Sequence, residues 1–125
     1  MKTYVITVSR YFPTTHPRKG EPTGFVDKIL SGEKIHTIRG NVALWTKRLR
    51  NVGEGKALLS LRYWEGKPYN SKQIEFLQLR AENRVGVEKI ALYPEYAWVQ
   101  GEQFTKIPIA NNDGLSLQDF NDWFG

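Results

Sequence analysis

The sequence predicts an α+β fold, mainly β, in which five or six short strands close into a β-barrel with a few short helices. Short runs rich in β-branched and aromatic residues recur along the chain, and turns that contain glycine or proline separate them. A length of 125 residues with 40% hydrophobic residues suits one core, so we expect a single domain over residues 1–125. Closure into a barrel is expected because it removes exposed strand edges.

The individual strands are predicted from alternation and composition. They are Thr3–Ser9, Ile35–Arg39, Ala57–Trp64, Gln73–Leu79, Val85–Tyr93 and Ala97–Ile109, with a break at residues 100–102 in the last. The turn at residues 65–69 is expected to join two of these strands in a hairpin.

Three short helices complete the predicted fold. The first follows Thr23 and ends at Gly32, with its apolar residues on one side. The second, residues 42–51, has the apolar and charged sides of an amphipathic helix. The third follows Ser116, and its apolar side is made by Leu117, Phe120 and Phe124. Residues 12–24 hold three prolines and two glycines, which predict a long surface loop.

Charge is distributed unevenly along the chain. Residues 1–72 contain 14 Lys and Arg against 5 Asp and Glu, net +9, whereas residues 73–125 contain 4 against 8, net −4. No basic amphipathic helix accompanies the excess, so the asymmetry favours a nucleic-acid partner over a membrane. A solvated surface that keeps the protein soluble is the alternative reading.

Composition also excludes several classes of site. The chain has no cysteine and only His16 and His36, which excludes disulfides and argues against a structural zinc site, so we expect no metal and no cofactor. The opening run MKTYVITVSRYF is too short for a signal peptide, and no stretch reaches the roughly 18 apolar residues of a membrane span. We therefore expect a cytoplasmic protein with no membrane partner.

Three blocks of the chain follow one another in the order of a known domain. They are FVDKILSGEKIHTIR (residues 25–39), with a short helix, a glycine and K-x-x-T-x-R, then RYWEGKPYNSKQ (62–73), a hairpin, and IANNDGLSLQDFNDWF (109–124), an acidic residue and a closing helix. In this order the blocks resemble the ASCH domain, a member of the PUA-like superfamily. The resemblance implies a PUA-like barrel, a positively charged cleft and a role in RNA metabolism.

The resemblance also implies candidate catalytic residues. A small bacterial branch of the family hydrolyses N4-acetylcytidine with a lysine, a threonine and an acidic residue. Lys34 and Thr37 match the first two, and Asp113 stands where that branch has glutamate. Thr37 would supply a nucleophile, Lys34 would act as a base if its amine is neutral, and Asp113 would orient the lysine or pass a proton to the leaving amine.

A second set of residues is expected to bind RNA or a ligand. It combines cations, which contact phosphates, with aromatic rings on which bases stack: Arg39, Arg62, Trp64, Lys67 and Trp45. Alternation places Thr37 and Arg39 on one face and His36 on the other, while Lys34 can lean towards either face.

These observations predict an ASCH-type protein that binds RNA or a modified nucleoside in a basic groove. One alternative is a hydrolase that acts in that groove, either an N4-acetylcytidine-type amidohydrolase or a ribonuclease. The other alternative is a protein-interaction module whose basic face meets an acidic partner.

Overall fold

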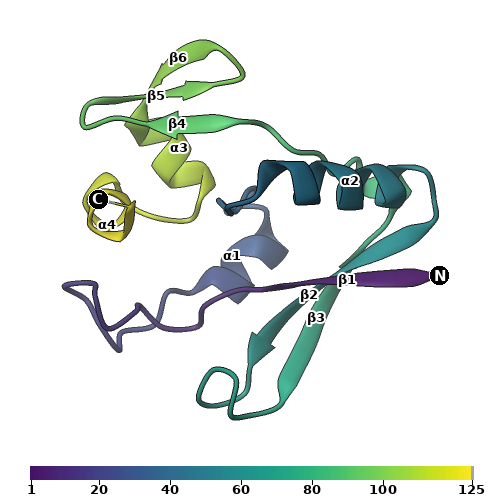
Figure 1. Ribbon diagram of the computed structural model, residues 1–125. Coiled ribbons are helices and arrows are strands. Elements are labelled where there is room, and N and C mark those ends of the chain that lie inside the picture. Colours follow the sequence, from purple (N-terminus) through teal and green to yellow (C-terminus); the bar gives the residue numbers. More distant parts are fainter. Residues whose placement is uncertain (125) are drawn as a thin grey trace. The chain divides into compact units, whose positions relative to one another are not determined.

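The described part of the chain, residues 1–124, folds as an α+β structure with six strands and four α-helices. We obtained it as a computed structural model (Figure 1). The elements are β1 (Lys2–Thr7), α1 (Phe25–Ser31), α2 (Val42–Gly53), β2 (Ala57–Trp64), β3 (Gln73–Leu79), η1, a single 3-10 turn (Ala81–Asn83), β4 (Ile90–Leu92), β5 (Tyr96–Val99), β6 (Glu102–Thr105), α3 (Lys106–Asn112) and α4 (Leu117–Phe124). The predicted fold class, α+β, is confirmed.

The six strands do not close into one barrel within the described residues. They form two separate three-stranded sheets, with strand orders β1-β2-β3 and β4-β5-β6. In the first sheet β1 runs parallel to β2 and β3 runs antiparallel to it, whereas the second sheet is entirely antiparallel. The sequence predicts one closed barrel, but among residues 1–124 strands β1 to β3 pair only with one another, and so do strands β4 to β6.

Contacts divide the chain into two compact units, each assembled from two stretches of sequence. Unit 1 comprises residues 1–10 and 39–87, and unit 2 comprises residues 11–38 and 88–125. Unit 1 therefore contains the first sheet with α2, and unit 2 contains the second sheet with α1, α3 and α4. The single domain expected over residues 1–125 stays a prediction.

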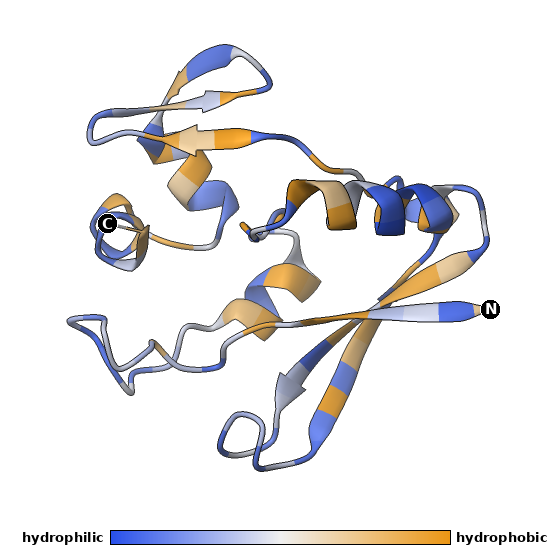
Figure 2. Cartoon of the chain, in the orientation of Figure 1, coloured by the Kyte–Doolittle hydropathy of each residue, from blue (hydrophilic) through white to orange (hydrophobic). Residues whose placement is uncertain are grey.

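The core of unit 1 lies between its sheet and α2. Side chains of β1 and β2 alternate, so Tyr4, Ile6, Leu59 and Leu61 face one side and are buried. Helix α2 packs on β2 and contributes Val52, which is fully buried. Figure 2 shows a hydrophobic first turn in α2, with mostly hydrophilic residues beyond it.

The core of unit 2 is aromatic. Phe120 of α4 is fully buried, and the ring of Trp123 lies 5.6 Å from the rings of both Phe12 and Phe25. Residues 12–24 follow an irregular path, as predicted, but the core holds them in place because Phe12 and His16 are buried.

Several predicted boundaries are confirmed. The predicted strands over residues 57–64 and 73–79 coincide with β2 and β3, and the predicted helix from residue 42 matches the start of α2. At α4 the Ser116 hydroxyl accepts a hydrogen bond from the Asp119 N–H at 3.1 Å, as the predicted N-cap requires. Thr23 Oγ1 accepts from the Phe25 N–H at 3.2 Å, although Gly24 is the N-cap residue of α1.

Three predicted strands need correction. Residues 35–39 are not a strand, because the N–H groups of Ile35 and His36 both donate to the Asn112 carbonyl instead of to a neighbouring strand. Of the strand predicted over residues 85–93, only β4 forms a ladder. Residues 106–109 are the start of α3, where Pro108 falls in the first turn and costs no intrahelical hydrogen bond.

No helix among the described residues is both long enough and apolar enough to cross a membrane.

Candidate functional site

A buried ion pair joins two of the three predicted catalytic residues in unit 2. Lys34 Nζ donates to Asp113 Oδ1 at 2.7 Å and to the Asp113 backbone carbonyl, also at 2.7 Å. The two side chains are only 3% and 5% exposed. Lys34 and Asp113 therefore form a buried pair, while their assignment to a functional site stays a prediction.

Local backbone geometry brings the two residues together. Helix α1 ends at Gly32, which adopts the left-handed conformation at φ +83°, and the Lys34 N–H then donates to the Lys28 carbonyl at 2.9 Å. Asp113 caps the C-terminus of α3, where its N–H donates to the carbonyls of Ile109 and Ala110. The end of α1 and the end of α3 thus meet at one ion pair.

The surroundings of the Lys34 side chain are tightly packed. Its ammonium lies 4.3 Å from the centroid of the Phe25 ring, a cation–π contact. Gly114 has φ +78°, and a Cβ at this position would lie 3.1 Å from Lys34 Cβ. Both the backbone conformation and the close approach therefore require glycine directly after Asp113.

His36 is the third ionisable group at this place. Its Nε2 lies 3.8 Å from Asp113 Oδ1, is buried, and has no hydrogen-bond partner among the described residues, while 34% of the side chain is exposed. Burial lowers the pKa of His36, and Lys34 lowers it further, against opposing contributions from Asp113, the Ile109 carbonyl and Glu88. This shift favours the neutral imidazole at pH 7.

Thr37, the third predicted catalytic residue, is exposed. Residues 34–38 lie outside the helices and strands, and their burial alternates. Lys34, His36 and Ile38 are buried or half-buried, whereas Ile35 and Thr37 are exposed. Sequence reasoning used the same alternation but set His36 aside because it lies opposite Thr37. The signal was present, since positions 34 and 36 share a face.

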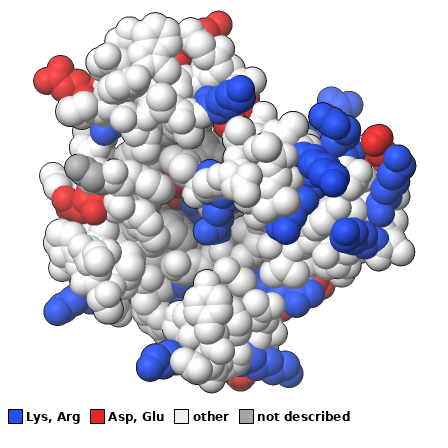
Figure 3. Space-filling view, viewed as in Figure 1, with Lys and Arg blue, Asp and Glu red and all other residues white. Residues whose placement is uncertain are grey.

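The positive charge of the chain is concentrated in unit 1. This unit contains 12 Lys and Arg against 4 Asp and Glu, net +8, whereas unit 2 contains 6 against 9, net −3. In Figure 3 many Lys and Arg side chains gather over α2, at the right of the view. A polyanion would therefore be attracted to unit 1 and weakly repelled by unit 2.

All five residues predicted to bind RNA or a ligand lie in unit 1, although two of them already make hydrogen bonds within the protein. They are Arg39, Trp45, Arg62, Trp64 and Lys67. Arg39 is exposed and donates to the Thr7 carbonyl. Arg62 donates through Nε to Ser60 Oγ at 2.9 Å and through Nη1 to Gln73 Oε1 at 3.1 Å.

The network around Arg62 is extended by a carboxylate. The Ser60 hydroxyl donates to the Glu75 carboxylate, and this hydrogen bond lowers the pKa of Glu75 more than desolvation raises it. Arg62 is therefore held in a fixed position on the polar face of the sheet. The Arg62 residue as a whole is half-buried.

The predicted aromatic residues are half-buried and lie against flat partners. The Arg48 guanidinium lies 4.8 Å from the Trp45 ring centroid. The ring centroids of Trp64 and Tyr69 are 5.2 Å apart, and Tyr69 is 85% exposed. Lys67 is exposed in the turn between β2 and β3. Flat rings and cations are therefore both present in unit 1, the two kinds of group that proteins binding single-stranded nucleic acid combine.

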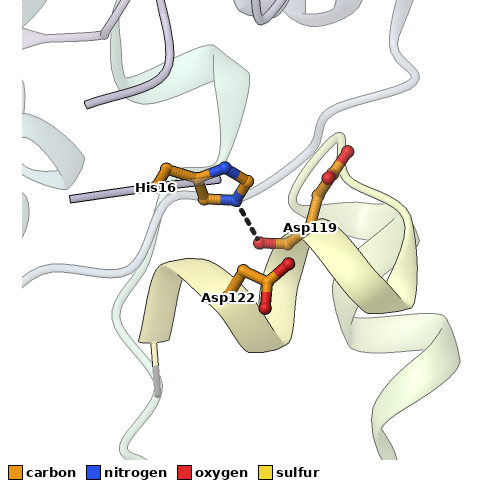
Figure 4. Close-up of side chains that lie close together, drawn as sticks. All are labelled: His16, Asp119 and Asp122. Carbon is orange, nitrogen blue, oxygen red and sulfur yellow. Dashed lines mark hydrogen bonds between the residues drawn. The ribbon is translucent and has the colours of Figure 1, made fainter. Parts of the chain in front are cut away.

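Figure 4 shows the one group among the described residues with the composition of a metal site. His16, Asp119 and Asp122 place ligand atoms within 4.8 Å of one another. Protein contacts already occupy these donors, however. His16 Nε2 bonds to the Asp119 carbonyl at 3.0 Å, His16 Nδ1 accepts from the Arg18 N–H, and the Arg18 guanidinium pairs with the Asp119 carboxylate. The contacts of this group hold residues 12–24 against α4, and they suit a structural role better than a metal site.

No family model, no curated protein and no solved structure matches this chain.

We predict that breaking the buried ion pair from one side will be costly. Lys34→Met leaves the Asp113 carboxylate buried without its cation, and we expect the free energy of unfolding to fall by about 3–5 kcal/mol. The double variant Lys34→Met/Asp113→Leu removes both charges and should lose less than the single variant. Denaturant unfolding measures both, and a double variant less stable than Lys34→Met would contradict this account.

We also predict a pH dependence from His36. Because its pKa is lower in the folded than in the unfolded state, the unfolded chain binds more protons in acid. This contribution to stability is complete above about pH 6.5, the ordinary value, and decreases as the pH falls towards the folded pKa. Unfolding measured between pH 8 and pH 5 should show a smaller acid loss for His36→Gln than for wild type. Parallel curves would show that His36 is not the group responsible.

Proposed function

We propose that this chain is an ASCH-type RNA-binding protein of the PUA-like superfamily, and that unit 1 holds single-stranded RNA or a modified nucleoside. The observation that carries the proposal is the separation of charge between the units, net +8 against −3. Proteins that bind single-stranded nucleic acid combine a cationic surface for the phosphates with rings for the bases. Unit 1 has both.

Helix α2 is the part of unit 1 best suited to phosphate contacts. Lys47 and Arg50 are exposed and lie three residues apart, so they share one side of the helix. Arg48 is half-buried, and its guanidinium lies over Tyr4 at 5.3 Å as well as over Trp45. We therefore assign the phosphate contacts to Lys47 and Arg50 and a supporting role to Arg48.

The polar face of the sheet supplies base contacts in this proposal. Arg62 and Gln73 present hydrogen-bonding groups whose positions the sheet fixes, and Trp64 follows two residues after Arg62 on the same face. Fixed donors next to a ring suit an unpaired base, which stacks on its flat side and is recognised along its edge.

This proposal predicts salt-dependent binding of a short RNA. A labelled ten-nucleotide oligouridylate should bind more weakly as salt rises, and Lys47→Gln/Arg50→Gln should reduce the slope of log K against log salt by up to about 1.4, at about 0.7 per lost contact. The control Lys19→Gln/Lys106→Gln removes equal charge from unit 2 and should leave the slope unchanged. Fluorescence anisotropy measures both, and equal effects of the two variants would refute a binding surface on unit 1.

A hydrolase is the second candidate, and the meeting of Lys34 with Asp113 favours it. The resemblance to the N4-acetylcytidine amidohydrolases implies such a pair. With two hydrogen bonds to Asp113, Lys34 is arranged as an ammonium donor, so we assign the general base to the neutral imidazole of His36. Water is added across the amide bond, giving cytidine and acetate. A water molecule activated by His36 is the nucleophile that fits this geometry, because Thr37, the nucleophile that the resemblance implies, faces the opposite side.

Turnover of N4-acetylcytidine tests this second candidate. If the site is catalytic, wild type releases cytidine, while His36→Gln and Lys34→Arg lose most of the activity. Thr37→Ala abolishes release if Thr37 is the nucleophile, and Thr14→Ala, which alters another exposed threonine of unit 2, leaves it intact. Chromatography of the products gives the rates. A wild-type protein that leaves the substrate unchanged at high concentration excludes this hydrolase reading.

A further inference from the structure

The outer face of the second sheet carries a row of aromatic side chains. Tyr96 and Trp98 lie two residues apart on β5 and so face the same side, with ring centroids 6.5 Å apart at 74°. The ring of Tyr93, just beyond β4, stacks on Tyr96 at 5.1 Å and 25°. The three rings form a continuous series, which we call the aromatic row.

The aromatic row is open to solvent. Tyr93 is 46% exposed, Trp98 is 38% exposed, and Tyr96 between them is half-buried. The register explains this exposure, because Trp98 is flanked by Ala91 on β4 and Gln103 on β6, neither of which covers an indole ring. The row is therefore a sheet face with rings available for stacking, and it makes no use of the ion pair described above.

Charge is arranged favourably around the row. Glu102 pairs with Val99, so both face the side opposite Trp98, and alternation from Ile90 places Glu88 on that opposite side too. Glu95 lies in the turn between β4 and β5. The same alternation places Lys89 on the side of the row. Although unit 2 is acidic as a whole, alternation places Glu88 and Glu102 on the side opposite the aromatic row and Lys89 on the side of the row.

We infer that the aromatic row is a base-stacking surface for single-stranded RNA, an inference that rests on the proposed function. Every base has a flat face, so stacking on Tyr and Trp needs no particular sequence. Gln103 and Thr105, which pair with Trp98 and Tyr96, add hydrogen-bonding groups beside the rings. A proline-rich peptide also binds to rows of rings, but Lys89 on the side of the row, with Glu88 and Glu102 on the other side, favours an anionic ligand.

Binding of a labelled ten-nucleotide oligouridylate to single variants tests this inference. Trp98→Ala should weaken binding about fivefold or more at every salt concentration, because it removes a stacked ring and no charge. The slope of log K against log salt should stay as in wild type. Tyr93→Ala should behave in the same way.

Phe104→Ala is the matched control. Phe104 is 40% exposed, nearly as much as Trp98, and it pairs with Ala97 on the opposite face of the same sheet, so its removal should leave RNA affinity unchanged. Circular dichroism and melting temperature check that each variant is folded.

The possible outcomes separate this inference from the proposed function. If wild type binds RNA with the expected salt dependence but Trp98→Ala and Tyr93→Ala bind as tightly as wild type, the stacking surface is refuted and the role of unit 1 stands. If wild type binds no RNA, both fail. If a decaproline peptide binds wild type and loses affinity in Trp98→Ala while RNA binding is unaffected, the row serves a protein partner and the inference is overturned.

Discussion

The structure of unit 2 depends on one buried carboxylate. Asp113 ends α3, accepts two hydrogen bonds from Lys34 through its side chain and carbonyl, and lies 3.8 Å from the His36 imidazole. A buried carboxylate is stable only with a cation and hydrogen bonds, so Lys34 must follow α1 at the distance that Gly32 sets. Gly114 must then leave room for the lysine stem. The residues at positions 32, 34, 113 and 114 are thereby constrained for structural reasons, and these reasons are the same whether or not the site is catalytic.

This constraint explains what the sequence could and could not predict. Strands β2 and β3 were predictable because alternation, composition and a glycine-containing turn agree over their whole length, and the Ser116 cap identified α4. Residues 35–39 have the composition of a strand, but the Asn112 carbonyl takes the N–H groups of Ile35 and His36 that a ladder would need. That choice depends on a contact 76 residues away from His36, which no local pattern records. The expectation that Lys34 and Asp113, which are far apart in the sequence, belong to one site came from the family resemblance and not from their spacing.

Charge gives a second contrast between sequence and structure. Counting along the chain divides it at residue 72 into net +9 and net −4, but the units are interleaved, and residues 11–38 join the acidic one. Lys34 therefore belongs to a unit of net charge −3, where its role is local pairing, while the cations suited to a polyanion lie on α2 and the first sheet. The proposed binding and the proposed hydrolysis, which the sequence placed in one groove, thus fall to residues of different units. We expect a mutation to remove either one without the other.

Amide chemical shifts measured during titration with a short single-stranded RNA test the central claim most directly, because they report every residue in one experiment. Our account predicts that the amides of α2 and of β2 and β3 shift together and saturate at one RNA concentration. The amides of Lys34 and Asp113 should move little. A titration in which α2 is unaffected at saturating RNA, or in which no amide shifts at low salt, would contradict the account.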